Sequence, residues 1–434
     1  MRRADLRDGA VYIQYSISIV LLFLTLPLTT FGGDNMAFPG AMGWGGETKG
    51  AWGHPTIEPV ILKVTSLSGG TEEGTLRWAL TRNYPRIVVF EVGGVIDLED
   101  GWITVTNPYL TIAGQTAPSP GITTINGYIY LDNGIHDVMI QHISMRTGEH
   151  ATDPENNLRY NLVISLGANN ILVDHCSFTW STFANIGITA PDNPPHNITV
   201  SNCIIAEGIE STWLKPGNPP YPAPSQGMFM NRNLYNITVL RNLFAWNDMR
   251  NPIGDGSEIV YVNNFIRGYS HDALLVGSWP GNKWSIVGNY AIARENSTRP
   301  HLVHVGGTTE EPTIYFEDNQ VFLSDGETPD DLYGGGVDRI IFSQEKHPWH
   351  DNIIQIHSED VPSYISVNVG ARPWDRDSID QRIIDDVVYG TGSVKTSETW
   401  GPHPDHEPTY REFDPDEWYL DAEHPGVEPK KWPI

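Results

Sequence analysis

The chain has 434 residues, only 18% of them charged, and it contains 42 glycines and 32 prolines, which excludes a coiled coil or a helical bundle. With 39% hydrophobic residues and 14 tryptophans it can bury a large core without metals or staples, so it is not disordered overall. The formal net charge of −26 repels nucleic acid and anionic membranes, and we expect no nucleic-acid partner.

The first 33 residues have the layout of a signal peptide. Arg2, Arg3 and Arg7 precede an apolar run from Ile17 to Leu28, which ends in small and polar residues. This run is shorter than the ~20 residues of a membrane span, so we expect cleavage and a secreted or periplasmic protein. An uncleaved N-terminal anchor is the alternative, because counting from Val11 lengthens the apolar stretch.

A capped amphipathic helix is predicted over residues 71–82, with the sequence TEEGTLRWALTR. We expect it to close the N-terminal end of the domain and to cover an apolar edge that would otherwise recruit another chain.

A short phrase with apolar residues at alternate positions recurs along the middle of the chain. The copies are HDVMIQHISM (136–145), NILVDHCSF (170–178), NITVSNCII (197–205), NITVLRNLF (236–244), EIVYVNNFI (258–266), KWSIVGNYA (283–291) and TIYFEDNQV (313–321). Their spacing varies between 22 and 39 residues, which is typical of a solenoid with insertions of different length in one loop. The alternation indicates strands, not helices.

One column of this alignment is polar or small at a bend. It holds Ile143, Cys176, Cys203, Asn242, Asn264, Asn289 and Asn319. Asparagine amides at a fixed bend can hydrogen bond along the stack. We therefore predict an all-β fold, a single-stranded parallel β-helix, for residues 34–392. A leucine-rich repeat is the competing fold, but its Leu-x-Leu spacing and helical return segment are missing.

The two cysteines, Cys176 and Cys203, fall in consecutive coils, about one strand spacing (~4.8 Å) apart. We interpret them as buried free thiols, and a disulfide remains the alternative in an exported protein. Zinc is not expected, because no histidines cluster with them.

Residues 393–434 are rich in proline, aromatic and acidic residues. The aromatic residues distinguish this segment from a disordered acidic tail, so we expect an extended arm packed along the β-helix.

Several phrases resemble, in order, those of exported bacterial pectate lyases of polysaccharide lyase family 1. They are AFPGAMGWGG (37–46), VTSLSGGTEEGTLRWAL (64–80), IVVFEVGGVIDL (87–98), LTIAGQTAPSPGI (110–122), VDHCSFTWS (173–181), RNLFAWNDMRNP (241–252), VNNFIRGYS (262–270) and NVGARPWDRDSIDQRIIDDVVYGTG (368–392). The resemblance covers about residues 37–392. It implies a right-handed parallel β-helix that cleaves pectate by β-elimination.

The resemblance also implies site residues. The family's catalytic arginine stands in an Arg-x-Pro motif, which here is Arg250-Asn251-Pro252. Because an arginine base has a pKa above ~12, a role for Arg250 as a carboxylate clamp is weighed beside a role as base. Further candidates for substrate binding are Lys215, Arg146, Arg241, Arg267 and His175.

The chain departs from the family where calcium is bound. The places of three acidic ligands are taken by Asn161, Phe183 and Ala184, and calcium needs six to eight oxygen ligands. The calcium expected from the family is therefore doubtful here, and we assign no metal ligands. Substitute carboxylates at Asp153, Glu155 or Asp192 are the alternative.

We therefore expect a lyase that cleaves a uronate-containing polysaccharide, pectate first, as a monomer, with cationic side chains replacing some or all of the calcium. A degenerate β-helix protein that binds acidic polysaccharide without cleaving it is the alternative. A hydrolase is disfavoured, because no pair of carboxylates stands out in the motif regions.

Overall fold

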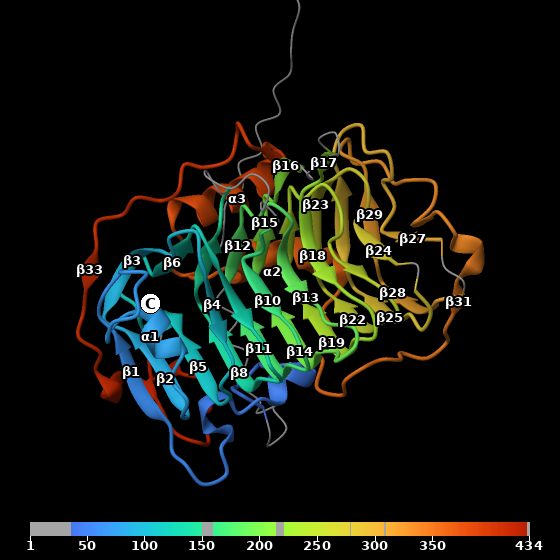
Figure 1. Cartoon of the computed structure of the whole chain (residues 1–434). Coiled ribbons are helices and arrows are strands. Elements are labelled where there is room, and N and C mark those ends of the chain that lie inside the picture. Colours follow the sequence, from blue (N-terminus) through green and yellow to red (C-terminus); the bar gives the residue numbers. More distant parts are fainter. Residues whose placement is uncertain (1–35, 150–158, 214–220, 278, 308–309, 432–434) are drawn as a thin grey trace, which may run out of the picture. The chain divides into compact units, whose positions relative to one another are not determined.

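The computed structural model describes residues 36–149, 159–213, 221–277, 279–307 and 310–431. The predicted signal peptide lies outside these residues. In the described chain, strands stack into a solenoid in which each full coil adds one strand to each of three parallel sheets (Figure 1). The predicted parallel β-helix is confirmed.

The first sheet has 11 strands. They are β1 (Val60–Val64), β2 (Arg86–Phe90), β5 (Leu110–Ala113), β8 (His136–Gln141), β11 (Asn169–Asp174), β14 (His196–Ser201), β19 (Tyr235–Leu240), β22 (Glu258–Val262), β25 (Lys283–Val287), β28 (Thr313–Glu317) and β31 (Ile341–Phe342). Neighbouring strands are parallel and in register, so that Ile171 of β11 faces Ile198 of β14.

The second sheet has 10 strands and the third has nine. The second sheet contains β3 (Val92–Asp97), β6 (Ile122–Ile125), β9 (Ser144–Arg146), β12 (Ser177–Thr179), β15 (Ile204–Ala206), β20 (Leu243–Ala245), β23 (Phe265–Tyr269), β26 (Tyr290–Ala293), β29 (Gln320–Phe322) and, antiparallel at its edge, β33 (Thr409–Tyr410). The third contains β4 (Trp102–Val105), β7 (Tyr128–Leu131), β10 (Leu162–Ile164), β13 (Ala184–Ile188), β18 (Gln226–Met230), β21 (Ile253–Gly254), β24 (Leu274–Val276), β27 (Val303–Val305) and β30 (Tyr333–Gly334).

The remaining elements are short. They are α1 (Leu76–Leu80), α2 (Val361–Asn368), α3 (Ser378–Tyr389), the 3₁₀ helices η1 (Trp44–Glu47), η2 (Gly50–Gly53), η3 (Gly114–Thr116), η5 (Val337–Arg339), η6 (Ser358–Asp360) and η7 (Pro415–Glu417), and the strands β16 (Ile209–Trp213), β17 (Tyr221–Ala223), β32 (Lys395–Thr396), β34 (Trp418–Tyr419) and β35 (Glu428–Pro429). Among the described residues, no helix is long and apolar enough to cross a membrane.

The core lies inside the coil, where alternate residues of every strand meet. In the third sheet, Ile186, Ile188, Met228 and Met230 point into this core and are fully buried. Because side chains alternate along a strand, the residues between them face outward. The third sheet therefore presents Phe229 on its outer face.

The predicted asparagine column forms a hydrogen-bonded ladder at the turn from the first sheet to the second. Oδ1 of Asn242 accepts from the amide of Cys203 at 2.9 Å, and Asn264 does the same for Asn242. Asn289 and Asn319 continue the pattern. The ladder satisfies backbone groups that the turn would otherwise bury without partners.

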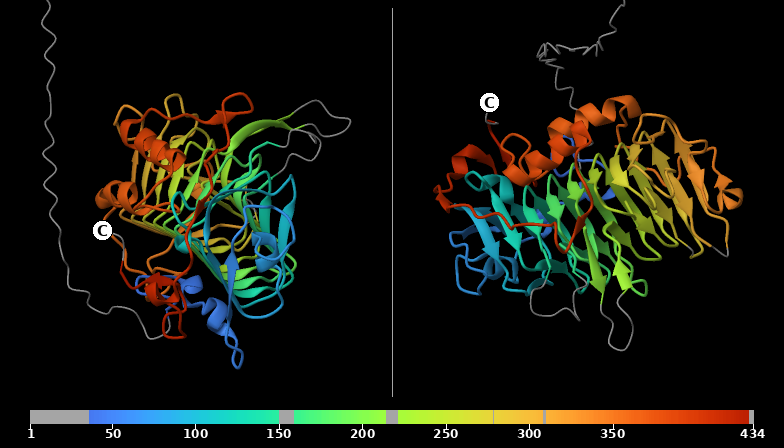
Figure 2. Two further views of the ribbon diagram at one scale, coloured as in Figure 1. Left: turned by 90° about the vertical axis from the view of Figure 1, so that its left-hand side faces the viewer. Right: turned by 90° about the horizontal axis from the view of Figure 1, so that it is seen from above.

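Later parts of the chain cover the outer faces of two sheets. Helices α2 and α3, drawn in orange-red, lie over the second sheet (Figure 2). Their residues Ile365, Ile383 and Val387 belong to one buried cluster with Leu243 and Ala245 of that sheet. In the C-terminal segment, Phe413, Trp418 and Val427 pack against Ile87 and Val89 of the first sheet. The division into domains at residues 33 and 392 stays a prediction.

The predicted capping helix is shorter than residues 71–82. Gly74 has a φ of 89°, which a right-handed helix does not allow, so α1 begins only at Leu76. The side chain of Thr75 caps it by accepting a hydrogen bond from the amide of Trp78. Leu76 and Leu80 are fully buried and join the core of the solenoid.

Candidate active site

Arg250 lies in the loop between β20 of the second sheet and β21 of the third. Its φ is 58°, a conformation that a residue with a side chain keeps only where its surroundings hold it. Nη1 donates a hydrogen bond of 2.9 Å to Oε1 of Gln226. Gln226 is 3% exposed and begins β18 in the preceding coil. A buried neighbour therefore anchors the half-buried guanidinium.

The charge of Arg250 is only partly compensated. Burial lowers the pKa of Arg250, against the opposing influence of Asp272, Asp255 and Tyr160. Its Nε atom is buried and finds no hydrogen-bond partner among the described residues. A cation in this state can bind the carboxylate of an acidic ligand.

A second arginine stands in the coils that follow. The amide of Asn251 donates to the carbonyl of Ala273 at 2.8 Å, which places Asp272 in the coil next to Arg250. Asp272 is 1% exposed and pairs with Nη1 of Arg299 at 3.1 Å. The side chain of Arg299 is 43% exposed, so its guanidinium reaches the surface as one member of an ion pair with Asp272.

A second asparagine ladder, which the sequence did not reveal, runs inside the turn from the second sheet to the third. Asn161 donates to Oδ1 of Asn185 at 2.8 Å, Asn185 to Asn247 at 3.3 Å, and Asn247 to Asn251 at 3.0 Å. The Oδ1 atom of Asn161 also accepts from the amide and the hydroxyl of Thr147. The side-chain amide of Asn161 is therefore fully used in internal hydrogen bonds.

Phe183 and Ala184 are the other two residues that replace acidic calcium ligands of the family. Phe183 lies between Tyr160 and Phe229, with ring centroids 5.2 and 5.6 Å away. We call Tyr160, Phe183 and Phe229 the aromatic row. Ala184 is fully buried. A phenyl ring, a methyl group and a committed amide offer no carboxylate oxygen, so these three positions do not fit a calcium ion.

Of the three substitute carboxylates, Asp192 is the one that the structure describes, and it does not fill the gap. Asp192 is exposed and follows β13 at its far end, opposite to Phe183. Asp153 and Glu155 lie outside the described residues. Within the part of the chain that the structure describes, no group of three histidine, cysteine or acidic side chains is placed to hold a metal ion.

Two of the predicted substrate-binding arginines are held under helix α3. Arg146 is fully buried in β9, where its Nη2 atom contacts Asp377 at 2.7 Å and Asp380 at 3.0 Å. Arg267 in β23 is half-buried and lines a cavity with Ile384 and Val388. Both side chains lie on the outer face of the second sheet, so we leave them out of the site at Arg250.

The other predicted residues also lie apart from Arg250. Arg241 follows β19 and donates to the carbonyl of Ile354 at 2.8 Å, with its guanidinium over the ring of Tyr364. Lys215 lies outside the described residues. Of the six predicted site residues, Arg250 is the only one in the described chain that lies just before a strand of the third sheet.

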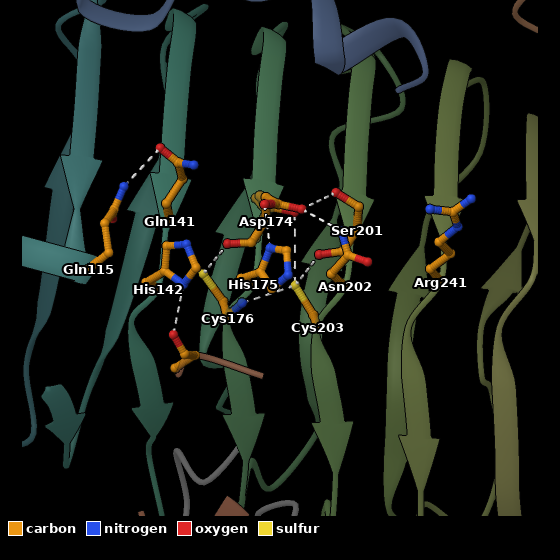
Figure 3. A network of polar contacts seen from close by, with 12 residues as sticks. Gln115, Gln141, His142, Asp174, His175, Cys176, Ser201, Asn202, Cys203 and Arg241 are labelled. Atoms are coloured by element: carbon orange, nitrogen blue, oxygen red, sulfur yellow. Dashed lines mark hydrogen bonds and ion pairs between the residues drawn. The ribbon is translucent and has the colours of Figure 1, made fainter. Parts of the chain in front are cut away.

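His175 belongs to a polar network at the turn from the first sheet to the second (Figure 3). It donates to Asp174 at 2.6 Å and stacks on His142 at 5.1 Å. Burial opposes ionisation of Asp174, but His175, Asn202 and Ser201 together hold its pKa below the usual value. The network ties adjacent coils together, which is a structural role for His175.

Comparison with known proteins places the chain in a family. No family model matches it. Over 385 residues it is 30% identical to a protein named probable pectate lyase C from Emericella nidulans, and the match covers 87% of this chain and 82% of that protein. The chain belongs to the pectate lyase family. A relative of the same name from Aspergillus oryzae is 27% identical, with 87% of this chain and 83% of that protein covered.

Solved structures confirm the fold of the family. The cedar pollen allergen jun a 1 superposes with a TM-score of 0.57 at 16% identity, covering 76% of this chain and 92% of that one. A pectate lyase from Bacillus sp. N165, solved in complex with trigalacturonate, gives 0.55 at 14% identity, covering 76% and 98%. The predicted resemblance and the lyase class are confirmed by family membership.

Sequence reasoning missed several residues around Arg250. Gln226, Tyr160 and Asp272 were not singled out, although each stands within two residues of a strand of the third sheet. Arg250 also lies just before a strand of the third sheet. A position at or just before the beginning of such a strand was therefore the sequence signal that could have identified these residues.

Proposed function

We propose that the protein cleaves a uronate-containing polysaccharide, polygalacturonan first, by β-elimination on the outer face of the third sheet. The observation that supports this most directly is the anchored and partly uncompensated guanidinium of Arg250 near Tyr160, one end of the aromatic row. Aromatic rings offer apolar faces that suit the C–H surfaces of sugars.

β-Elimination requires two things of these residues. The proton at C5, α to the uronate carboxylate, must leave, and the negative charge that develops on the carboxylate must be stabilised. Arg250 is placed to do the second, and burial moves its pKa in the direction that a base requires. Gln226 fixes the orientation of the guanidinium.

Cationic side chains take over charge neutralisation in this proposal. Arg299 places a second guanidinium in the coils beyond Arg250, and Asp272 holds it in position. The positions of Asn161, Phe183 and Ala184 supply no calcium ligands, so no step of this mechanism depends on calcium at that site.

The experiment follows the absorbance of the unsaturated uronate product during incubation with polygalacturonan, methylated pectin and other uronate polymers. Arg250→Ala should lower kcat at least ~100-fold, because it removes the group that stabilises the developing charge. Arg411→Ala, which removes an arginine that is 49% exposed on the C-terminal segment, should leave kcat unchanged. Wild-type protein that binds these polymers and forms no unsaturated product would overturn the proposal and indicate a binding protein instead.

We also propose that the protein is exported and acts as a monomer. The support for export is the charged and apolar pattern of residues 1–33. Fractionation of the producing cells and light scattering of the purified protein test the two points.

A further inference from the structure

A buried carboxylate holds an exposed imidazole next to the coil that carries Arg250. Nδ1 of His271 lies 2.8 Å from Oδ2 of Asp248. Asp248 is 1% exposed, whereas the side chain of His271 is 42% exposed. Because an ionised carboxylate can only accept a hydrogen bond, Nδ1 of His271 carries a proton and donates it to Asp248. The other ring nitrogen, Nε2, is therefore left for contacts beyond this pair.

Asp248 is fixed from several sides. Its Oδ1 atom accepts from Oγ of Ser270 at 2.8 Å and pairs with Nη2 of Arg294 at 3.2 Å. Its amide donates to Oγ of Ser225 at 3.0 Å. The carboxylate is therefore oriented before any ligand arrives, and it orients His271 in turn.

The pair lies beside the proposed reaction site. Asp248 precedes Arg250 by two residues in the same loop, and the amides of Ser270 and His271 both donate to the carbonyl of Asp248. Because adjacent coils are about 4.8 Å apart, His271 and Arg250 belong to neighbouring layers of the same loop series.

One further acid faces the pair. Burial raises the pKa of Glu210 in β16, as does the nearby charge of Asp248, while Arg294 and His271 act in the opposite direction. The charged groups around His271 are thus Asp248, Arg294 and Glu210.

We propose that His271 is the proton donor to the leaving glycosidic oxygen, with Asp248 as its positioning residue. This rests on the proposed elimination. The base, Arg250 in its neutral form, takes the C5 proton and becomes the guanidinium cation that offsets the negative charge developing on the carboxylate. The electron pair of the C5–H bond becomes the double bond between C4 and C5. The C4–O bond breaks, its electrons stay on oxygen, and that oxygen takes the proton from Nε2 of His271. Solvent then reprotonates His271 and takes the proton from Arg250.

The test varies the leaving group. On polygalacturonan, His271→Ala should lower kcat ~100-fold or more, as expected for loss of a general acid. A galacturonate with a 4-nitrophenoxy group at C4 expels a phenolate that needs no proton, so His271→Ala should stay within about threefold of wild type there. Arg250→Ala should lose activity on both substrates, and Asp248→Asn should show the His271→Ala pattern in weaker form.

Controls separate a catalytic role from a structural one. His301→Ala changes a histidine further along the same loop series whose Nδ1 contacts only the backbone carbonyl of Asp331 among the described residues, and it should leave both activities unchanged. His271→Gln keeps a polar side chain and should behave like His271→Ala, with thermal unfolding near that of wild type.

Three results would overturn the inference. If kcat of His271→Ala on polygalacturonan is unchanged, His271 is not the proton donor, and the proposed function still stands. An equal loss on both substrates assigns His271 a structural role. Absence of elimination by the wild type on every uronate polymer overturns the proposed function and this inference with it.

Discussion

The ring of Phe183 meets the ring of Tyr160 at 74° with centroids 5.2 Å apart, at a position where the family resemblance implies a carboxylate. Tyr160 directly precedes Asn161, whose amide is fully engaged in the second asparagine ladder. Aromatic packing and an internal amide thus replace a charged surface. A calcium ion at this position would therefore lack charged ligands.

We predict that elimination by this protein proceeds in the presence of a chelator. Product absorbance on polygalacturonan should be the same within about twofold with calcium or with excess chelator, because the charge is neutralised by arginine in this proposal. A calcium-dependent pectate lyase assayed in parallel serves as the control and should lose its activity. Loss of activity in both proteins would mean that this chain holds calcium through other groups.

The aromatic row should contribute to substrate binding. Phe183→Ala should raise KM about three- to tenfold with little change in kcat, because stacking on a sugar ring acts on substrate and transition state alike. Phe183→Tyr preserves the ring and is the matched variant, with KM expected near wild type. A fall in kcat with unchanged KM would place Phe183 in the chemistry instead.

The fold could be read from the sequence because its signal is local. Asn242, Asn264 and Asn289 stand at one fixed offset after alternating strands, and this column became the observed ladder. The second ladder was missed, because its members have no common offset from a strand: Asn161 directly precedes β10, Asn185 lies within β13, and Asn247 follows β20.

The candidate site was only partly predictable for a different reason. The motif located Arg250, but Arg146 looked equally suitable at the end of a strand. Its partner Asp377 comes 231 residues later and caps helix α3, which covers the second sheet. Which face of a sheet is covered by a distant segment is a tertiary property that no local pattern carries.

Interruption of the first ladder should cost stability. Asn264 is fully buried, accepts from Asn242, and donates to the carbonyls of Val239 and Val262. Asn264→Ala leaves buried polar groups without partners, so the free energy of unfolding should fall by about 3 kcal/mol. The free energy of unfolding is measured by urea denaturation. The control Asn83→Ala, at an exposed residue, should change this free energy by less than about 0.5 kcal/mol. A loss below about 1 kcal/mol for Asn264→Ala would show that the ladder is dispensable.

The cysteines should be thiols that react only after unfolding. Cys176 and Cys203 are both free and fully buried, and the amide of Cys176 donates to Sγ of Cys203 at 3.4 Å. Burial raises the pKa of Cys203 and so disfavours the reactive thiolate. A thiol reagent should modify neither residue in native protein and both in urea. Asn83→Cys should react at once, and a native chain whose two cysteines resist the reagent even in urea would instead contain a disulfide.

Stability should fall as the pH falls, in part because of His142. Burial, together with the neighbouring charge of His175, lowers the pKa of His142 from an ordinary value of 6.5 to about 3. Between these two values the unfolded chain binds a proton that the folded chain does not, so the free energy of unfolding decreases with decreasing pH across this window. The contribution of one such group is at most about 1.4 kcal/mol per pH unit.

His142→Asn isolates that contribution. The asparagine amide can replace the ring Nδ1–H, which lies 2.8 Å from the carbonyl of Ala371, but it does not titrate. The variant should be less stable at pH 7, because it loses the stack on His175 and the contact with Trp374. Its urea midpoint should fall less steeply than that of wild type between pH 6.5 and 4, whereas His347→Asn, at an exposed histidine, should keep the wild-type slope. Parallel slopes for wild type and His142→Asn would mean that His142 takes up its proton within the folded protein, and the acid sensitivity would then belong to other groups.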